Sequence, residues 1–212
     1  MQHARANPRE VAFGFYGGAL AQAIRRFKYE DRPYLARPLG ALLGGACRGA
    51  GLRVDAVLPV PLHARKLVER GYNQSALLAA HVAAQTGAPL LTSTLVRDLD
   101  TSPQAELSGQ DRGANVDQAF TIEGGTWVEG RTFALVDDVM TTGATLAAAS
   151  RPLLAAGARD VVAVVVARTP SSALRNPLGL DAGETRDVGV PRAYASSGCA
   201  NVPMRANLRE LR

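Results

Sequence analysis

The chain has 212 residues, of which 47% are hydrophobic, and this is enough to bury the core of one α/β domain. Its formal net charge is +5, but all of its 24 basic residues except Lys28 and Lys66 are arginines, and they form no basic run. Charge alone therefore does not indicate a nucleic-acid-binding protein. No apolar run approaches the roughly 20 residues that a membrane span needs, so we expect a cytoplasmic protein without a membrane segment.

The first half of the chain predicts helices and one strand. Apolar residues at helical spacing run from Phe13 to Gly44, with a break at Arg32 and Pro33, and predict two short helices. The β-branched run Val54 to Val60 predicts a strand. Asn73 can cap a following helix, Gln74 to Gln85, whose alanines and leucines suit burial against a sheet.

The second half predicts a strand, a long polar excursion and then a strand–helix–strand unit. The excursion is too long for an ordinary connection, which is typical of functional or disordered segments. Gly157 is placed to stop the last helix in a left-handed conformation. In chain order the segments are strand Leu90 to Val96, excursion Arg97 to Gln118, strand Thr132 to Val136, helix Ala144 to Ala156 and strand Val161 to Ala167.

These elements predict an α/β fold with a mostly parallel central sheet flanked by helices. After Pro170 no periodicity of either kind remains. We therefore expect an N-terminal extension over residues 1–12, one domain over 13–169 and an irregular or disordered tail over 170–212.

The segment Phe133 to Thr145 carries the clearest chemical signal. An apolar strand ends in Asp137 and Asp138, and a Thr/Gly loop then leads into a helix. Parallel sheets bind ligands beyond the carboxyl ends of their strands, where the next helix offers free N–H groups and a positive dipole end. We therefore expect a phosphate against the loop residues Met140, Thr141, Thr142, Gly143, Ala144 and Thr145.

Two adjacent carboxylates repel phosphate, but each can accept a hydrogen bond from one of the vicinal hydroxyls of a ribose. The segment therefore predicts a ribose at Asp137 and Asp138 and its 5′-phosphate at the loop. The alternative is structural: acids that end a strand and a threonine that caps a helix. The absence of Gly-Lys-Ser/Thr excludes a nucleoside-triphosphate P-loop.

The Phe133 to Thr145 segment resembles the phosphoribosyl pyrophosphate motif of type I phosphoribosyltransferases. More narrowly, the chain is similar to the ComF family of competence-associated proteins, which are related to glutamine amidophosphoribosyltransferases. Further matching segments are Phe27-Lys28-Tyr29, Val57 to Leu62 with Arg70 to Gln74, and Thr101 to Phe120 with Gln104, Leu107, Arg112 and Asn115.

The resemblance implies that Val60 to Tyr72 faces pyrophosphate, with Arg65, Lys66 and Arg70 as its cations, although a solvated basic loop is the alternative. It also implies that the polar excursion is a mobile flap carrying Gln104, Arg112 and Asn115, of which Arg112 is a second phosphate candidate. Tyr72 could stack on a base or pack on the sheet, and a histidine such as His63 is more often a surface residue.

The implied reaction is displacement of pyrophosphate from C1 of the ribose. Asp137 and Asp138 act as the catalytic pair, and Mg²⁺ enters with phosphoribosyl pyrophosphate. Many ComF proteins begin with a zinc ribbon, but Cys47 and Cys199 lie far apart and no Cys-x-x-Cys is present, so no zinc is expected.

Three functions stay open at the level of sequence. The first is a phosphoribosyltransferase with an unidentified nitrogen acceptor. The second is a non-catalytic protein of competence or DNA uptake with a helicase-type partner, and the third is a regulator that senses a nucleotide or phosphoribosyl pyrophosphate. Whether the protein forms a homodimer is also open.

Overall fold

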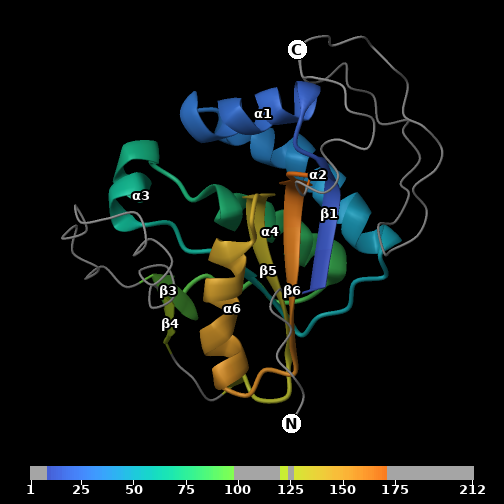
Figure 1. Ribbon diagram of the computed structural model, residues 1–212, viewed down its shortest axis with the longest axis vertical. Helices are drawn as coiled ribbons and strands as arrows, with labels where there is room; N and C mark the ends of the chain where they lie inside the picture. The colour runs from blue at the N-terminus through green and yellow to red at the C-terminus, as the bar shows by residue number, and fades with distance from the viewer. Residues whose placement is uncertain (1–8, 98–119, 124–126, 171–212) are drawn as a thin grey trace.

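The computed structural model describes residues 9–97, 120–123 and 127–170 (Figure 1). Its centre is a parallel sheet of four strands in the order β1-β6-β5-β2. These strands are β1 (Arg9–Phe15), β2 (Ala56–Pro59), β5 (Thr132–Met140) and β6 (Asp160–Arg168). The parallel pairing confirms the predicted α/β class and follows from strands that are apolar along almost their whole length.

Helices cover both faces of the sheet. The helices in the described part of the chain are α1 (Gly18–Tyr29), α2 (Ala36–Gly49), α3 (Ala64–Arg70), α4 (Gln74–Thr86) and α6 (Ala144–Ala155), with the short 3₁₀ helix η1 (Pro33–Leu35) between α1 and α2. Figure 1 shows α6 in front of the sheet, α2 and α4 behind it, and α1 above the carboxyl ends of β5 and β6. No helix in the described part of the chain is long and apolar enough to cross a membrane.

The core is divided by the sheet into two layers. Behind it, Ile24 and Phe27 of α1 and Leu78 of α4 pack against strand residues such as Val136 and Val164. In front of it, α6 contributes Leu146 and Leu153, which pack on Phe133, Leu135 and Val165. The alternation of β5 and β6 residues between these two layers fixes which strand residues point to which helices.

The structure corrects the predicted start of the domain. β1 begins at Arg9 and pairs in parallel with β6, so residues 9–12 belong to the sheet rather than to an N-terminal extension, and Phe13 to Phe15 are strand rather than helix. The break at Arg32 and Pro33 is confirmed, because α1 ends before it and η1 begins at Pro33. The predicted tail from residue 171 onward lies outside the described residues.

Two further strand predictions also change. The predicted strand from Leu90 to Val96 is divided into a single parallel bridge between Leu90 and Val57 and the short strand β3 (Leu95–Arg97). β3 pairs antiparallel with β4 (Phe120–Ile122), which the sequence did not predict. The caps are confirmed: Asn73 accepts a hydrogen bond from the Ser75 backbone N–H, and Gly157 after α6 has a φ of 88°.

Candidate functional site at the carboxyl edge of the sheet

The strand β5 carries the carboxylate pair, and it extends further than predicted. It continues to Met140 instead of ending at Val136, because Asp137, Val139 and Met140 keep their pairing with Val165, Ala167 and Arg168 of β6. The two aspartates therefore lie within the last paired residues of β5, where the parallel pairing with β6 fixes their backbone.

Each aspartate has its own set of partners. Asp138 is buried, and its Oδ1 lies 2.8 Å from the Nζ of Lys28, which is in the last turn of α1. Asp137 Oδ1 accepts a hydrogen bond of 2.8 Å from the Ser75 hydroxyl at the start of α4 and another of 2.8 Å from the Asp138 backbone N–H. The pair is thus held by α1 on one side and α4 on the other.

The electrostatics of the pair are unfavourable for two negative charges. Burial, with the nearby charge of Asp138 as the second cause, raises the pKa of Asp137 from 3.8 to about 7. The hydrogen bonds from Ser75 and the Asp138 N–H, together with the Lys28 charge, act in the opposite direction but are smaller. A proton therefore resides on the pair for part of the time at neutral pH.

The loop after β5 forms a hollow directly beside Asp137. Its lining is Asp137 and residues 139–146. Gly143 has a φ of 80°, which favours glycine, and it begins α6 without a side-chain cap. Thr141, Thr142 and Thr145 are exposed, and only a long contact of 3.3 Å joins the Ala144 N–H to the Thr142 hydroxyl. The first turn of α6 thus presents N–H groups and hydroxyls at the hollow.

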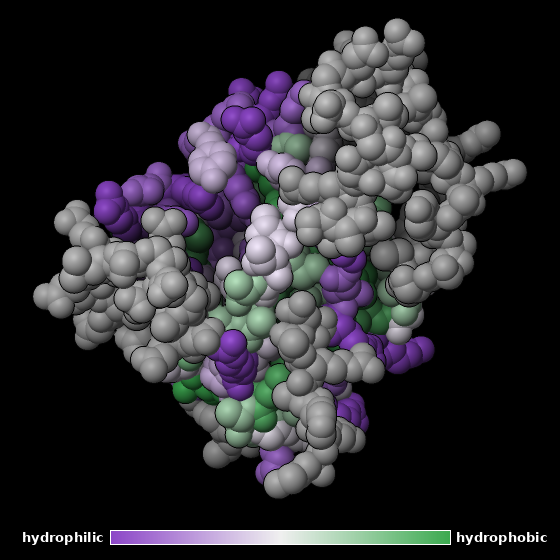
Figure 2. Space-filling view, in the orientation of Figure 1, coloured by the Kyte–Doolittle hydropathy of each residue, from purple (hydrophilic) through white to green (hydrophobic). Residues whose placement is uncertain are grey.

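The three predicted pyrophosphate cations differ in their surroundings. Arg65 and Lys66 are exposed on α3, a helix without buried residues that stands away from the sheet in Figure 1, and Arg65 pairs with Glu69 at 3.2 Å. Arg70 is partly buried: its Nη1 donates to Gln74 Oε1 at 3.0 Å, and its guanidinium lies 5.0 Å from the Tyr29 ring centre. Figure 2 shows hydrophilic side chains over both α1 and α3.

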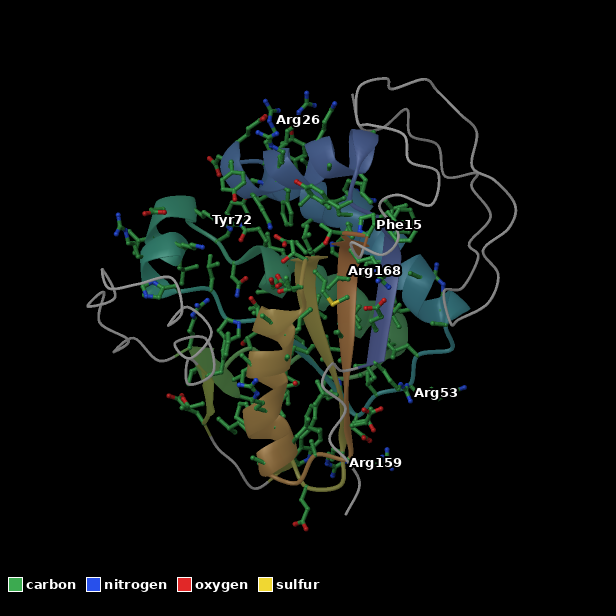
Figure 3. The ribbon with its side chains drawn as sticks, viewed as in Figure 1. Phe15, Arg26, Arg53, Tyr72, Arg159 and Arg168 are labelled. Atoms are coloured by element: carbon green, nitrogen blue, oxygen red, sulfur yellow. The ribbon has the colours of Figure 1, made fainter. Side chains whose placement is uncertain are left out.

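The structure shows the contacts of Tyr72 and His63, for which the sequence left alternatives open. The Tyr72 hydroxyl donates to the Phe27 carbonyl at 2.5 Å, and its ring lies 5.9 Å from the Phe27 ring, so Tyr72 packs against α1. Figure 3 shows Tyr72 between α3 and α1. His63 caps α3 by accepting from the Arg65 backbone N–H at 3.2 Å. The candidate flap residues Gln104, Arg112 and Asn115 lie outside the described residues.

Sequence reasoning missed Lys28 and Ser75 as members of the site. Lys28 appeared only as part of a matching segment, and Ser75 stood beside a predicted cap. A signal existed for Ser75, because a helix that follows a parallel strand begins at the carboxyl edge of the sheet, where its first hydroxyl can reach the neighbouring strand. Gln74, the first residue of α4, is fully buried, and its Nε2 has no hydrogen-bond partner in the described structure.

A dedicated metal site is not evident at this edge. Among the described residues, no three His, Cys, Asp or Glu side chains group together as metal ligands. Asp138 is engaged by Lys28, and one oxygen of Asp137 already accepts two hydrogen bonds. The described residues therefore do not fit a resident magnesium ion held by protein ligands alone.

Comparison with known proteins gives concordant matches. The phosphoribosyl transferase domain model matches residues 73–177. Competence protein F of Haemophilus influenzae is 35% identical over 157 residues, which are 71% of this chain and 69% of that protein. The DNA utilization protein YhgH of Escherichia coli K12 is 34% identical over 166 residues, which are 76% of this chain and 72% of that protein.

Among solved structures, the glutamine phosphoribosylpyrophosphate amidotransferase of B. subtilis, complexed with ADP and GMP, is 19% identical with a TM-score of 0.47. That match covers 66% of this chain and 30% of the amidotransferase.

The parallel sheet, the carboxylate pair and the Thr/Gly loop, together with the domain match, define a phosphoribosyltransferase domain of the type I fold. Within this class, the identity to competence protein F and to YhgH over most of both chains places the protein more narrowly. It belongs to the ComF family of competence-associated proteins.

Proposed function

We propose that this protein binds phosphoribosyl pyrophosphate, or a related ribose 5-phosphate, at the carboxyl edge of its sheet. The observation that carries the proposal is that Asp137 of the carboxylate pair lines the hollow at the start of α6, with Asp138 next to it on β5. The activity that suits this arrangement is transfer of the phosphoribosyl group to a nitrogen acceptor with release of pyrophosphate.

The two halves of the site match the two ends of a ribose 5-phosphate. The N–H groups and hydroxyls from Thr141 to Thr145 suit a doubly charged phosphate, which also benefits from the dipole of α6. Asp137 and Asp138 suit the vicinal ribose hydroxyls, which donate hydrogen bonds to ionised carboxylates. As the bond to pyrophosphate breaks, the same negative charges would stabilise the positive charge that develops on the ribose.

Arg70 is the best placed of the proposed pyrophosphate cations. Gln74 and the Tyr29 ring hold its guanidinium, so less side-chain entropy is lost on binding than for the exposed Arg65 and Lys66. Magnesium enters this proposal with phosphoribosyl pyrophosphate rather than as an ion held by the protein, and it would supply positive charge to the leaving group.

The decisive experiment is incubation with labelled phosphoribosyl pyrophosphate and Mg²⁺, with and without ammonia or nucleobases. Binding by calorimetry and pyrophosphate release are measured in parallel, with the Asp137→Asn, Asp138→Asn double variant as a control that keeps the fold but lacks both carboxylates. Acceptor-dependent release that the double variant loses is expected. If the parent protein binds no ribose phosphate at all, the proposal is wrong.

A second candidate function follows from the names of the relatives, competence protein F and DNA utilization protein. The protein would then bind a ribose phosphate or nucleotide without turnover and act through a helicase-type or DNA-uptake partner, or as a sensor in nucleotide metabolism, in the cytoplasm. Tight binding without release for any acceptor favours this function, and sedimentation with and without ligand tests the homodimer.

A further inference from the structure

Among the described residues, Lys28 is the cation that forms an ion pair with the carboxylate pair Asp137 and Asp138. Its Nζ lies 2.8 Å from Asp138 Oδ1, and its side chain is 22% exposed, against 7% for Asp138. All but one of the other basic residues in this chain are arginines, so a lysine here stands out against the composition. An ammonium is a compact charge with three donors, and it can serve a carboxylate and a second acceptor at the same time.

The backbone position of Lys28 is fixed by the packing of its neighbour in α1. Phe27 is fully buried in the core, and its carbonyl accepts the Tyr72 hydroxyl at 2.5 Å. Tyr72 leads into α4, and Ser75 in that helix holds Asp137. The end of α1 is thus fastened to the same helix that holds the other carboxylate, and Lys28 cannot leave Asp138 without breaking this packing or changing its rotamer.

The carboxylate pair is therefore asymmetric. Asp138 has a full positive charge at hydrogen-bond distance, whereas the donors to Asp137 among the described residues are neutral, namely the Ser75 hydroxyl and a backbone N–H. In the described part of the chain, Asp138 and Lys28 are the charges that act on Asp137, and α4 contributes the uncharged Ser75. One cation for two adjacent carboxylates, of which Asp138 is buried and Asp137 is partly buried, leaves one charge uncompensated.

We propose that Lys28 is a positioning residue of the ribose site, which fixes Asp138 as the ionised acceptor and leaves Asp137 as the carboxyl that releases a proton when the ribose binds. The inference rests on the proposed function, since it assigns roles within that ribose site. The raised pKa of Asp137, which burial and Asp138 cause and which Lys28 opposes, is consistent with this division. A protonated Asp137 has one acceptor fewer for the ribose, so ribose phosphate affinity should rise with pH through neutrality.

The test compares Lys28→Met, Lys28→Arg and Arg26→Met in the full chain. Arg26 lies on the same helix, is half exposed and pairs with Glu30, and Figure 3 shows it on the outer side of α1, so its removal changes the net charge equally without touching the pair. Affinity for ribose 5-phosphate is measured from pH 5.5 to 9, a melt checks folding, and ¹³C NMR follows the aspartate carboxyls of the ligand-free protein.

Lys28→Met should weaken binding about tenfold or more at pH 7 and shift the midpoint of the pH profile upward, with affinity partly regained above pH 8. Lys28→Arg should recover most of the affinity, and Arg26→Met should behave as the parent. If Lys28→Met proves too unstable, the double variant Lys28→Met, Asp138→Asn removes the unpaired charge. It should bind ribose 5-phosphate weakly, and the midpoint of its pH profile should lie below that of Lys28→Met.

The outcomes distinguish a failure of the proposed role of Lys28 from a failure of the proposed function. If Lys28→Met keeps the parent affinity and midpoint, or if Lys28→Arg is as impaired as Lys28→Met at every pH, the role of Lys28 is wrong while the proposed function stands. If the parent binds no ribose 5-phosphate or phosphoribosyl pyrophosphate, the proposed function is wrong, and the role of Lys28 in a ribose site falls with it, whatever the NMR titration shows.

Discussion

At the scale of single residues, Asp138 is where function and stability can be separated. Asp138→Asn keeps the volume and one acceptor but replaces a charge-assisted hydrogen bond with a neutral one. Because hydrogen bonds to charged groups are worth about 1.5–3 kcal/mol, ribose phosphate affinity should fall on the order of tenfold to a hundredfold. Calorimetric titration with phosphoribosyl pyrophosphate measures this loss.

The stability of the same variant has two opposing contributions. Removing one of two adjacent charges relieves repulsion, which alone would leave stability unchanged or raised. The structure adds the loss of the Lys28 ion pair, but Lys28 is partly exposed and can turn toward water. We expect a melting temperature close to that of the parent. If Asp138→Asn binds phosphoribosyl pyrophosphate like the parent, or loses binding only because it unfolds, the carboxylate pair has a structural role instead.

Asp137 should make stability depend on pH. Its pKa in the folded protein, about 7, lies above the ordinary value of 3.8, so between these values the folded state holds a proton that the unfolded state has released. Its contribution to stability is therefore complete near pH 4 and is lost as the pH rises to about 7. Asp137→Asn keeps the acceptor for Ser75 and removes the titration.

Thermal melts of parent and Asp137→Asn from pH 4 to 9 test this dependence. The melting temperature of the variant should gain on that of the parent as the pH rises from 4 to 7, and the difference should then stay constant. A difference that is equal at pH 5 and pH 8 would mean that Asp137 titrates normally.

Site residues could be predicted from the sequence only where they lie close to one another along the chain. Asp137, Asp138 and Gly143 were identified because they fall within one short segment whose chemistry is legible locally. Lys28 and Ser75 were not, since they meet the aspartates only after α1 and α4 have packed on the sheet. Lys28 is followed closely by Glu30 and Asp31, so its own sequence neighbourhood gives no reason to pair it with the distant Asp138.

At the scale of elements, α6 offers a test with its two terminal glycines. Gly143 at its start and Gly157 after its end have φ of 80° and 88°, so alanine at either position should cost about 1–2 kcal/mol of stability. Only Gly143→Ala places a methyl group at the hollow, so it should also weaken inorganic phosphate binding about tenfold.

¹H–¹⁵N NMR titration with phosphate measures the difference between the two variants. The amide signals of residues 140–145 should shift in the parent and in Gly157→Ala. If phosphate shifts other amides instead, or if both variants bind equally, the phosphate position is wrong.

The contact between α2 and α4 gives a second test at this scale. A Cβ built at Gly40 would lie 2.4–2.6 Å from atoms of His81, whereas one at Gly45 would meet only the end of Arg48 at 3.8 Å. Gly40→Ala should therefore lower the free energy of unfolding by about 1–3 kcal/mol. Gly45→Ala should raise it by up to about 1 kcal/mol through helix propensity. Denaturant unfolding of both variants gives the comparison, and equal effects would contradict the tight packing of these helices.

Elements were predictable where periodicity was strong. The helix Gln74–Thr86 and the strand Asp160–Arg168 were found within one or two residues, because an alanine-rich stretch and a valine run each carry a clear signal. β1 was missed, since Arg9 to Phe15 alternates weakly and a sheet edge is defined by its partner β6. α3 was missed because it has no buried face to give a pattern.

At the scale of the whole molecule, the site belongs to no single part of the sequence. Lys28, Ser75 and Asp138 come from α1, α4 and β5, and each of these elements also contributes to the core behind the sheet. A ligand that contacts this edge therefore binds only when both the sheet and the helices behind it are in place. Binding should consequently be coupled to global unfolding rather than to fraying of one loop.

The thermal stability of the whole chain should report on the ligand's chemistry. Phosphoribosyl pyrophosphate at about 100 times its dissociation constant should stabilise the fold by about 2.7 kcal/mol, because it binds the folded state alone. Inorganic phosphate at the same multiple of its own constant should do the same through the α6 hollow alone. Asp138→Asn should therefore lose about half or more of the stabilisation by phosphoribosyl pyrophosphate at a fixed concentration but keep that by phosphate. Melts of parent and variant with each ligand form the measurement, and equal losses for both ligands would show that the carboxylates and the phosphate loop do not divide the ligand as proposed.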